Sequence, residues 1–309
     1  MLIEADPKQY YHFFSKDPHP FVSKGFIELN GRKVDKVLYL TEDSNKPGLG
    51  LVAGVRDGWL LSPFSAPFGG FHFRKEVMYI SEIEEFLKAL KIFVAEKKYL
   101  GVKITLPPDI YHLTINSKLV KAFFKEGYKD EVLDLTNWVE LQDFQDRFSQ
   151  KNSKEYYKQA VRNNLEFTKT TDGADQYEIY NLIVENRKKF GRPIYMSYQD
   201  IQDTAKLWPV DYFKVTSNEH NILAGAIIYH SSPKIAFALF WGDNDEGRQL
   251  RAMDYLTFHL WTHYRDLDYR YMDLGISTED GQPNEGLLRF KESHEAVSSL
   301  KYRFYWKPV

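Results

Sequence analysis

Short apolar runs separated by turn-forming residues recur through the first third of the chain and predict an antiparallel meander. The runs end in clusters of Asp, Ser, Asn, Pro and Gly, which break regular structure and favour tight turns. Apolar residues at helical spacing then predict an amphipathic helix. The predicted strands are 26–29, 34–40, 49–55, 59–63, 102–106 and 128–135, and the predicted helices are 80–98 and 118–126.

The second half of the chain repeats this order of predicted strands and helices. Its predicted helices are 141–150, 153–165, 178–190, 248–264 and 286–294, and its predicted strands are 212–217, 223–230, 235–241, 270–274 and 300–306. The shared order predicts an α/β (α+β) protein of two similar units, each with a mixed, mostly antiparallel sheet flanked by helices. We expect the units to be residues 1–138 and 139–309.

Polar residues concentrate in residues 269–296, where a short apolar strand stops at a glycine and a polar loop leads into a helical pattern. Asp273, Asn284 and Lys291 are therefore expected around one strand end, a place where open α/β sheets commonly bind ligands. The alternative is a surface loop between two core elements.

This stretch resembles the C-terminal signature of the FemAB-like peptidyltransferases, which belong to the GNAT-fold (acyl-CoA N-acyltransferase) superfamily. A strand ending in D-L-G is followed by N-x-G-L-x-x-F-K, which Asn284, Gly286, Leu287, Phe290 and Lys291 match. After the lysine this chain has E-S-H-E-A, where those proteins often have a glycine-containing stretch. The resemblance implies two tandem GNAT-like units and an N-acyltransferase that moves an acyl or aminoacyl group to an amine.

The resemblance also implies roles for individual residues of the second unit. Lys291 would stabilise the negative oxygen that develops as the amine attacks, and Asn284 and Phe290 would contact substrate. Asp273 would orient the acceptor amine or accept its proton; the alternative is a carboxylate that caps the following loop. Arg162, in a loose match to another FemAB-like pattern, would face substrate.

The acyl donor is left open between acyl-CoA and aminoacyl-tRNA. GNAT enzymes that use acyl-CoA place a Q/R-x-x-G-x-G/A loop before the central helix, and its backbone N–H groups bind the pyrophosphate. The corresponding residues 247–253 keep Arg248 but have Arg251 and Met253 where close backbone approach is needed. This departure argues against acyl-CoA. Arg248 and Arg251 are candidates to bind phosphate through their side chains, with helix-end surface cations as the alternative.

A basic cluster at residues 185–192 is interpreted mainly as a solvated helix end, with phosphate binding as the less favoured alternative. His259 and His263 lie one turn apart but lack the glutamate of a zinc motif, so they are interpreted as packing residues and no metal site is expected.

Composition narrows the remaining possibilities. The chain has no cysteine, which excludes disulfides, thiol nucleophiles and zinc–thiolate sites. A net charge of −2 gives no general attraction to nucleic acid, so tRNA is a weak expectation as partner. No signal peptide or membrane-spanning run is recognised, which predicts a cytoplasmic protein. The resemblance to FemAB-like proteins implies a small-molecule or peptide amine as acceptor. The alternative function is a non-catalytic GNAT-fold binding protein for a peptide, sugar or nucleotide.

Overall fold

The computed structural model describes residues 1–308 of the 309-residue chain, which divides into two units. The first unit is Met1–Leu135, joined by Glu279–Gln282 and by the chain from Ser299 onward. The second unit is Thr136–Thr278 with Pro283–Ser298. The chain therefore returns to the first unit for its last strand.

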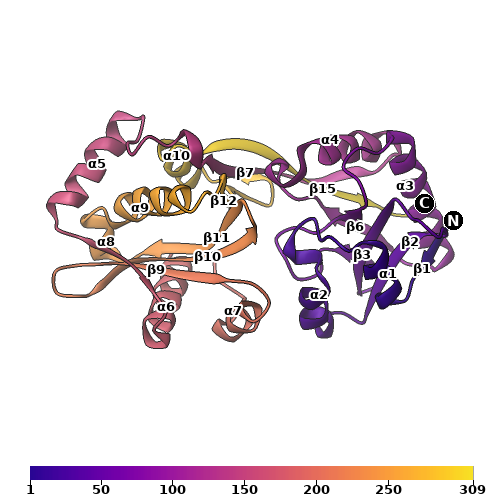
Figure 1. The fold of residues 1–309 in the computed structure, drawn as a ribbon, viewed down its shortest axis with the longest axis horizontal. Helices are drawn as coiled ribbons and strands as arrows, with labels where there is room; N and C mark the ends of the chain where they lie inside the picture. The colour runs from indigo at the N-terminus through magenta and orange to yellow at the C-terminus, as the bar shows by residue number, and fades with distance from the viewer. Residues whose placement is uncertain (309) are drawn as a thin grey trace. The chain divides into compact units, whose positions relative to one another are not determined.

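The first unit has a sheet with strand order β1-β2-β3-β4-β6-β15, in which β5 also pairs with β3 and the neighbours β4 and β6 are parallel. Helices α3 and α4 cover one face of this sheet, and α1 and α2 cover the other (Figure 1). The elements are β1 (Leu2–Glu4), α1 (Pro7–Phe13), α2 (Lys24–Asn30), β2 (Lys36–Glu42), β3 (Leu49–Arg56), β4 (Trp59–Ser62), β5 (Phe71–Phe73), α3 (Ile80–Glu96), β6 (Gly101–Thr105), α4 (Asp109–Lys125) and β15 (Val297–Trp306).

Alternation along β2 builds both cores of this unit. Leu38 and Leu40 pack in the cluster with α3 and α4, whereas Tyr39 points to the opposite face and packs with α1. The predicted strand 26–29 is instead part of helix α2, because Ser23 caps the backbone N–H of Phe26 and the helix buries one side.

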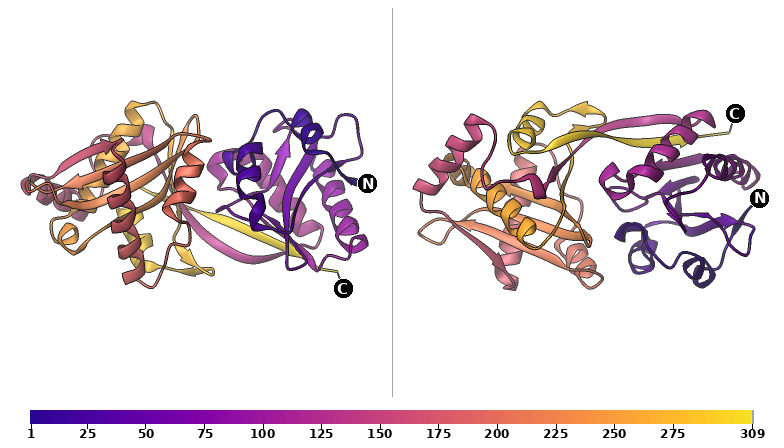
Figure 2. Two further views of the ribbon diagram at one scale, coloured as in Figure 1. Left: turned by 90° about the horizontal axis from the view of Figure 1, so that it is seen from below. Right: turned by 45° about the horizontal axis from the view of Figure 1, so that its top comes forward.

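In the second unit the strand order is β7-β12-β11-β10-β9-β8, and the part of β7 before Thr136 belongs to the first unit. Helices α5 and α9 lie on one face and α6 and α7 on the other (Figure 1), and Figure 2 (left) shows α6 running across the strands. The elements are β7 (Lys129–Glu140), α5 (Lys151–Arg162), β8 (Glu166–Thr170), α6 (Gly173–Lys189), α7 (Tyr198–Ala205), β9 (Val210–Thr216), β10 (Ile222–Ser232), β11 (Ile235–Asp243), α8 (Asp245–Gln249), α9 (Ala252–Asp266), β12 (Tyr271–Ile276) and α10 (Glu285–Ser293); β13 (Thr278–Glu279) and β14 (Gln282–Pro283) form a separate short pair.

Helix α6 approaches its sheet closely at Gly225 of β10. A Cβ atom at Gly225 would lie 2.7 Å from Cγ2 of Ile179, a distance that real Cβ contacts do not show. Glycine is therefore required here by packing, because a larger residue would force the helix away from the strand.

Strands β11 and β12 diverge after a short parallel pairing. The pairing covers three residue pairs, from Ile235↔Tyr271 to Phe237↔Asp273. Beyond it, β11 continues against β10 with an irregular step at Ile227/Ile228, and β12 continues against β7. The ends of the two strands thus have different partners, and the polar loop after β12 starts where they separate.

Two predicted helices of this unit differ in the structure. Residues 141–150 form a single 3-10 turn, Leu141–Asp143, followed by irregular chain. The predicted helix 248–264 is split into α8 and α9 by Arg251, which adopts a left-handed conformation with φ of 66°.

Candidate functional site

Lys291 is a buried cation on the inner side of α10. Its exposed fraction is 1%, and its Nζ donates hydrogen bonds to the carbonyl oxygens of Gly275 at 3.0 Å and Ile276 at 2.9 Å. An ammonium group has three N–H donors, so these two carbonyls leave one direction of the nitrogen for another partner.

The protonation of Lys291 is tuned by its surroundings. Burial lowers the pKa of Lys291 to about 7; the negative charge of Asp273 opposes this effect, and the positive charge of Arg187 adds to it. Lys291 therefore changes charge near neutral pH, a property of groups that transfer protons or stabilise developing charge.

The end of β12 is shaped to present its carbonyl groups to Lys291. Gly275 has φ of 66°, and its N–H donates to Oδ1 of Asp273 at 2.9 Å. Asp273 has an exposed fraction of 1%, so its carboxylate holds the turn and supplies negative charge inside the protein. This arrangement matches the loop-capping alternative for Asp273; a direct role toward an acceptor amine stays a prediction.

We expect Gly275→Ala to lower the free energy of unfolding by about 1–2 kcal/mol, because an L-residue is strained in the left-handed region. The added Cβ would meet a ring atom of Phe237 at an ordinary 3.6 Å, so backbone strain dominates the loss. Urea unfolding measures the change. Gly173→Ala is the control, since Gly173 has open space around it and no left-handed φ, and an equal loss there would refute the argument.

The N-x-G-L part of the motif starts helix α10. Asn284 is the N-cap: its Oδ1 accepts the Leu287 N–H at 3.2 Å, and its own N–H donates to the Ser277 carbonyl at 2.8 Å. The Nδ2 atom of Asn284 is buried and has no hydrogen-bond partner within residues 1–308. The cap therefore keeps a donor available beside the cavity that it lines.

A cavity of about 590 Å³ lies in the second unit, between elements that meet near the N-terminus of α9. It is rich in guanidinium groups and aromatic rings and has few carboxylates. Its arginines are Arg187, Arg192, Arg248, Arg251 and Arg289, its aromatic residues are Tyr156, Phe190, Trp241 and Phe290, and its acids are Asp243 and Asp254.

Two of these arginines are held in place by protein groups. Arg248 donates to Oδ1 of Asp243 at 2.8 Å and lies over the Phe190 ring at 5.3 Å. Arg251 stacks on the Tyr156 ring at 3.8 Å. Burial raises the pKa of Asp243, against the effect of the Arg248 charge. The cavity wall is therefore an ordered, largely positive surface with π faces beside it.

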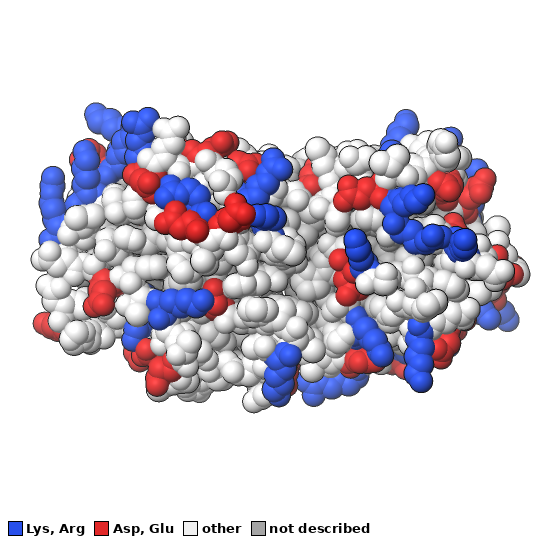
Figure 3. All heavy atoms as spheres, in the orientation of Figure 1, with Lys and Arg blue, Asp and Glu red and all other residues white. Residues whose placement is uncertain are grey.

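The structure brings together four of the predicted binding residues: Asn284, Phe290, Arg248 and Arg251 all line the cavity. Lys291 and Asp273 are buried next to it, at the end of β12 and on the same helix as Asn284 and Phe290. Arg162 is not among the lining residues; it is exposed in the last turn of α5. Lys and Arg side chains gather over α5 in Figure 3, with Lys151, Lys154, Lys158 and Arg162 recurring along that helix.

Some cavity residues were not singled out, or were not favoured, from the sequence. Arg187, Phe190 and Arg192 come from α6 and the turn after it, within the basic cluster for which a solvated helix end was preferred over phosphate binding. His294 and Asp254 also line the cavity. The signal for His294 was the departure from the family pattern after Phe290-Lys291.

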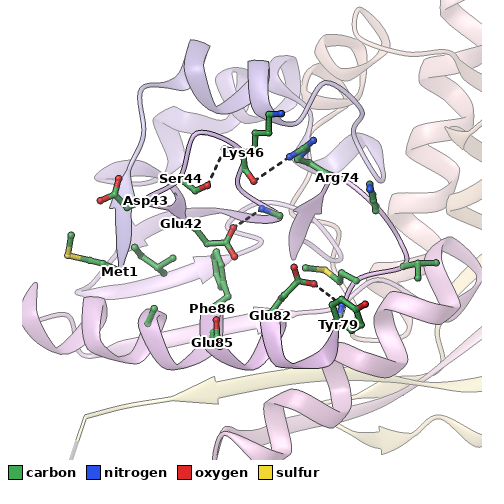
Figure 4. A pocket seen from close by; sticks show the side chains of 16 residues that line it. Met1, Glu42, Asp43, Ser44, Lys46, Arg74, Tyr79, Glu82, Glu85 and Phe86 are labelled. Carbon is green, nitrogen blue, oxygen red and sulfur yellow. Dashed lines mark hydrogen bonds between the residues drawn. The ribbon is translucent and has the colours of Figure 1, made fainter.

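A second cavity, of about 630 Å³, lies in the first unit between α3 and the loops after β2 and β5 (Figure 4). Two of its carboxylates hold local structure: Glu42 accepts the Gly48 N–H at 2.7 Å, and Glu82 accepts the Tyr79 N–H at 2.7 Å. Sequence reasoning did not single out this place.

Two kinds of feature are absent from residues 1–308. No helix among residues 1–308 is both long and apolar enough to cross a bilayer. In the same range no three His, Asp or Glu side chains are grouped so that they could hold a metal ion.

Comparisons with known proteins give structural neighbours. No protein-family model and no curated protein sequence matches the chain. Among solved structures, FemX matches with a TM-score of 0.69 and 10% identity, over 100% of this chain and 97% of that one. L-PGS from Bacillus licheniformis matches with a TM-score of 0.61 and 16% identity, over 99% and 93%. A tandem GNAT protein from the clavulanic acid biosynthesis pathway matches with a TM-score of 0.57 and 6% identity, over 100% and 99%.

The chain has the tandem GNAT fold. The predicted fold class is confirmed, and the resemblance to FemAB-like proteins is confirmed at the level of the fold. In the tandem GNAT fold of this chain, the N-x-G-L-x-x-F-K residues form the cap and body of α10, next to the divergence of β11 and β12.

Proposed function

We propose that this tandem GNAT protein is an N-acyltransferase whose second unit moves an acyl or aminoacyl group to an amine. The observation that carries the proposal is Lys291: it is buried, its pKa is lowered to about 7, its Nζ donates to two backbone carbonyls at the end of β12, and it lies on the helix whose residues Asn284 and Phe290 line the cavity. Burying a lysine is costly, because the desolvation of its charge is not fully offset. A functional role gives a reason for a lysine to be kept at such a position.

The chemistry needs a charge-stabilising group at this place. A neutral amine attacks the donor carbonyl carbon, a C–N bond forms, and negative charge collects on the carbonyl oxygen until the bond to the leaving oxygen or sulfur breaks. The amine nitrogen loses one proton and the leaving group gains one. The Lys291 ammonium, held by the carbonyls of Gly275 and Ile276, would use its remaining N–H to stabilise the oxyanion.

The cavity suits a donor that ends in a phosphorylated nucleoside. Guanidinium groups pair with phosphate oxygens, and Tyr156, Phe190, Trp241 and Phe290 offer faces for a base. Both acyl-CoA and an aminoacylated RNA 3′ end have this chemistry.

The segment before α9 favours the RNA end over acyl-CoA. The Gly247 N–H is already bonded to Oδ1 of Asn244 at 2.7 Å, and a Cβ at Gly247 would lie 2.2 Å from the Leu223 carbonyl oxygen. This turn is packed against β10, and Arg251 and Met253 carry side chains where a pyrophosphate would need bare backbone.

The proposal is tested by donor assays with wild type and Lys291→Ala. Aminoacyl-tRNAs and acyl-CoAs are each incubated with a mixture of small-molecule and peptide amines, and amide products are identified by mass spectrometry. The expected result is product from aminoacyl-tRNA with wild type and loss of product with Lys291→Ala, while thermal unfolding and donor binding persist. Ligand binding without turnover, unaffected by Lys291→Ala, would support a non-catalytic binding protein instead.

A further inference from the structure

The turn that follows Lys291 contains a buried histidine–aspartate pair. His294 ends helix α10 and has an exposed fraction of 2%; Asp254, in the first turn of α9, has 6%. The His294 Nε2 atom lies 3.0 Å from Oδ1 of Asp254. Both residues line the 590 Å³ cavity, and no role described so far uses them.

The hydrogen bonds hold both ring nitrogens of His294. The Nδ1 atom lies 2.7 Å from the carbonyl oxygen of Phe290 and 3.1 Å from Ser293 Oγ. Ser293 Oγ also lies within hydrogen-bond distance of the same carbonyl, at 2.8 Å. The imidazole is therefore fixed on one side by the last turn of α10 and on the other by Asp254 of α9.

The same turn is tied to neighbouring helices through its backbone. Trp261 of α9 donates its Nε1–H to the His294 carbonyl at 2.9 Å, and Ser153 of α5 donates to the Ser293 carbonyl at 2.6 Å. The N–H groups of His294 and Ala296 both donate to the Lys291 carbonyl, at 3.0 and 3.1 Å. A displacement of His294 would therefore also displace the backbone of Lys291.

Both ring nitrogens of His294 are occupied by protein groups, so the imidazole has no free atom for a substrate. Its contacts join the C-terminal end of α10, which carries Lys291, to the N-terminal end of α9. In a catalytic site an error of about 1 Å costs about 100-fold in rate, so a group that holds this turn has a kinetic effect without touching substrate.

We propose that His294, through its hydrogen bonds to Asp254 and to the Phe290 carbonyl, is a positioning residue that holds the turn of α10 so that Lys291 meets the reacting carbonyl. The inference rests on the proposed function of the same site. It assigns to this chain a clamp at the place where its sequence departs from the glycine-containing pattern of FemAB-like proteins.

The test compares variants that break or preserve the clamp. We expect His294→Ala to lower kcat about 10- to 100-fold with KM within about twofold, because the donor cavity persists while Lys291 is misplaced. Asp254→Asn should lose less kcat than His294→Ala, since its amide group can still hydrogen-bond to Nε2 of His294. His220→Asn, in an exposed loop with left-handed φ, is the control for replacing a histidine.

The titration of Lys291 gives a readout that does not depend on turnover. It is followed by NMR on protein in which lysine is labelled at Cε. The Lys291 signal is assigned as the one that is absent from the spectrum of Lys291→Met. In His294→Ala the midpoint should rise by about one pH unit as water reaches the loosened site, and in Asp254→Asn it should not move. If His294→Ala does not fold, Asp254→Ala carries both measurements.

Unchanged kcat and an unchanged Lys291 midpoint in His294→Ala would overturn the inference. A loss of kcat in Asp254→Asn equal to that in His294→Ala would also overturn it, because the charge of Asp254, and not its hydrogen bond to His294, would then be required. If wild type turns over no donor, the proposed function fails, and the NMR titration alone decides whether His294 positions Lys291.

Discussion

Lys291→Ala is expected to lower kcat for acyl transfer about 100- to 1000-fold, the loss that follows removal of one charge-stabilising donor from an acyl-transfer site. Donor affinity should change little, because the arginines and rings that line the cavity remain. Single-turnover kinetics with a saturating donor separates the two effects. Lys291→Arg is also expected to be impaired, since a planar guanidinium cannot reproduce the contacts of Nζ with Gly275 and Ile276.

The pH dependence shows which form of Lys291 acts. If the ammonium stabilises the oxyanion, kcat should fall as pH rises through about 7, where Lys291 loses its proton. A weakly basic acceptor that is already neutral at pH 6 removes the opposing effect of acceptor ionisation. A kcat that rises over this range would show that neutral Lys291 acts as a base, and the oxyanion role would be wrong.

Stability should carry a large pH dependence from the same residue. Burial lowers the pKa of Lys291 from 10.5 to about 7. Between these values the unfolded chain binds a proton that the folded protein does not, so the free energy of unfolding rises with pH across this window and is flat below it with respect to this group. Each pH unit contributes about 1.4 kcal/mol, which amounts to about 5 kcal/mol over the whole window.

This prediction is measured as the difference between wild type and Lys291→Met in urea unfolding from pH 6 to pH 9.5. Wild type should gain stability relative to the variant as pH rises above about 7. Lys158→Met, which removes an exposed lysine from α5, provides the background pH dependence. The prediction fails if the difference in free energy of unfolding between wild type and Lys291→Met, corrected for that background, stays constant with pH. Lys291 would then keep its proton in the folded protein.

The sequence motif around Lys291 was predictable because its spacing has a local physical cause. Asn284 caps α10, and Lys291 follows seven residues later on the side that faces the end of β12. Apolar periodicity likewise predicted the helices and strands of both sheets, since each element buries one side along its whole length.

The features that the sequence did not predict depend on interactions between residues far apart in the chain. Arg187 and Arg192 have the composition of a solvated helix end, and only the sheet beneath α6 turns them toward a cavity. The break between α8 and α9 depends on the contact of Gly247 with Leu223, which no local pattern reveals. His294 is paired with Asp254, which lies 40 residues away in the sequence, so no local motif could predict this contact.

The return of the chain to the first unit has a consequence for synthesis. Strand β15 pairs with β6 through Arg303↔Thr105 and its neighbours, and Phe304 is fully buried in the core of that unit. Domains made on the ribosome usually fold in order from the N-terminus. Here the N-terminal unit cannot complete its sheet until β15 has emerged from the exit tunnel. A nascent chain stalled before Val297 would expose the β6 edge and its apolar neighbours to chaperones and proteases.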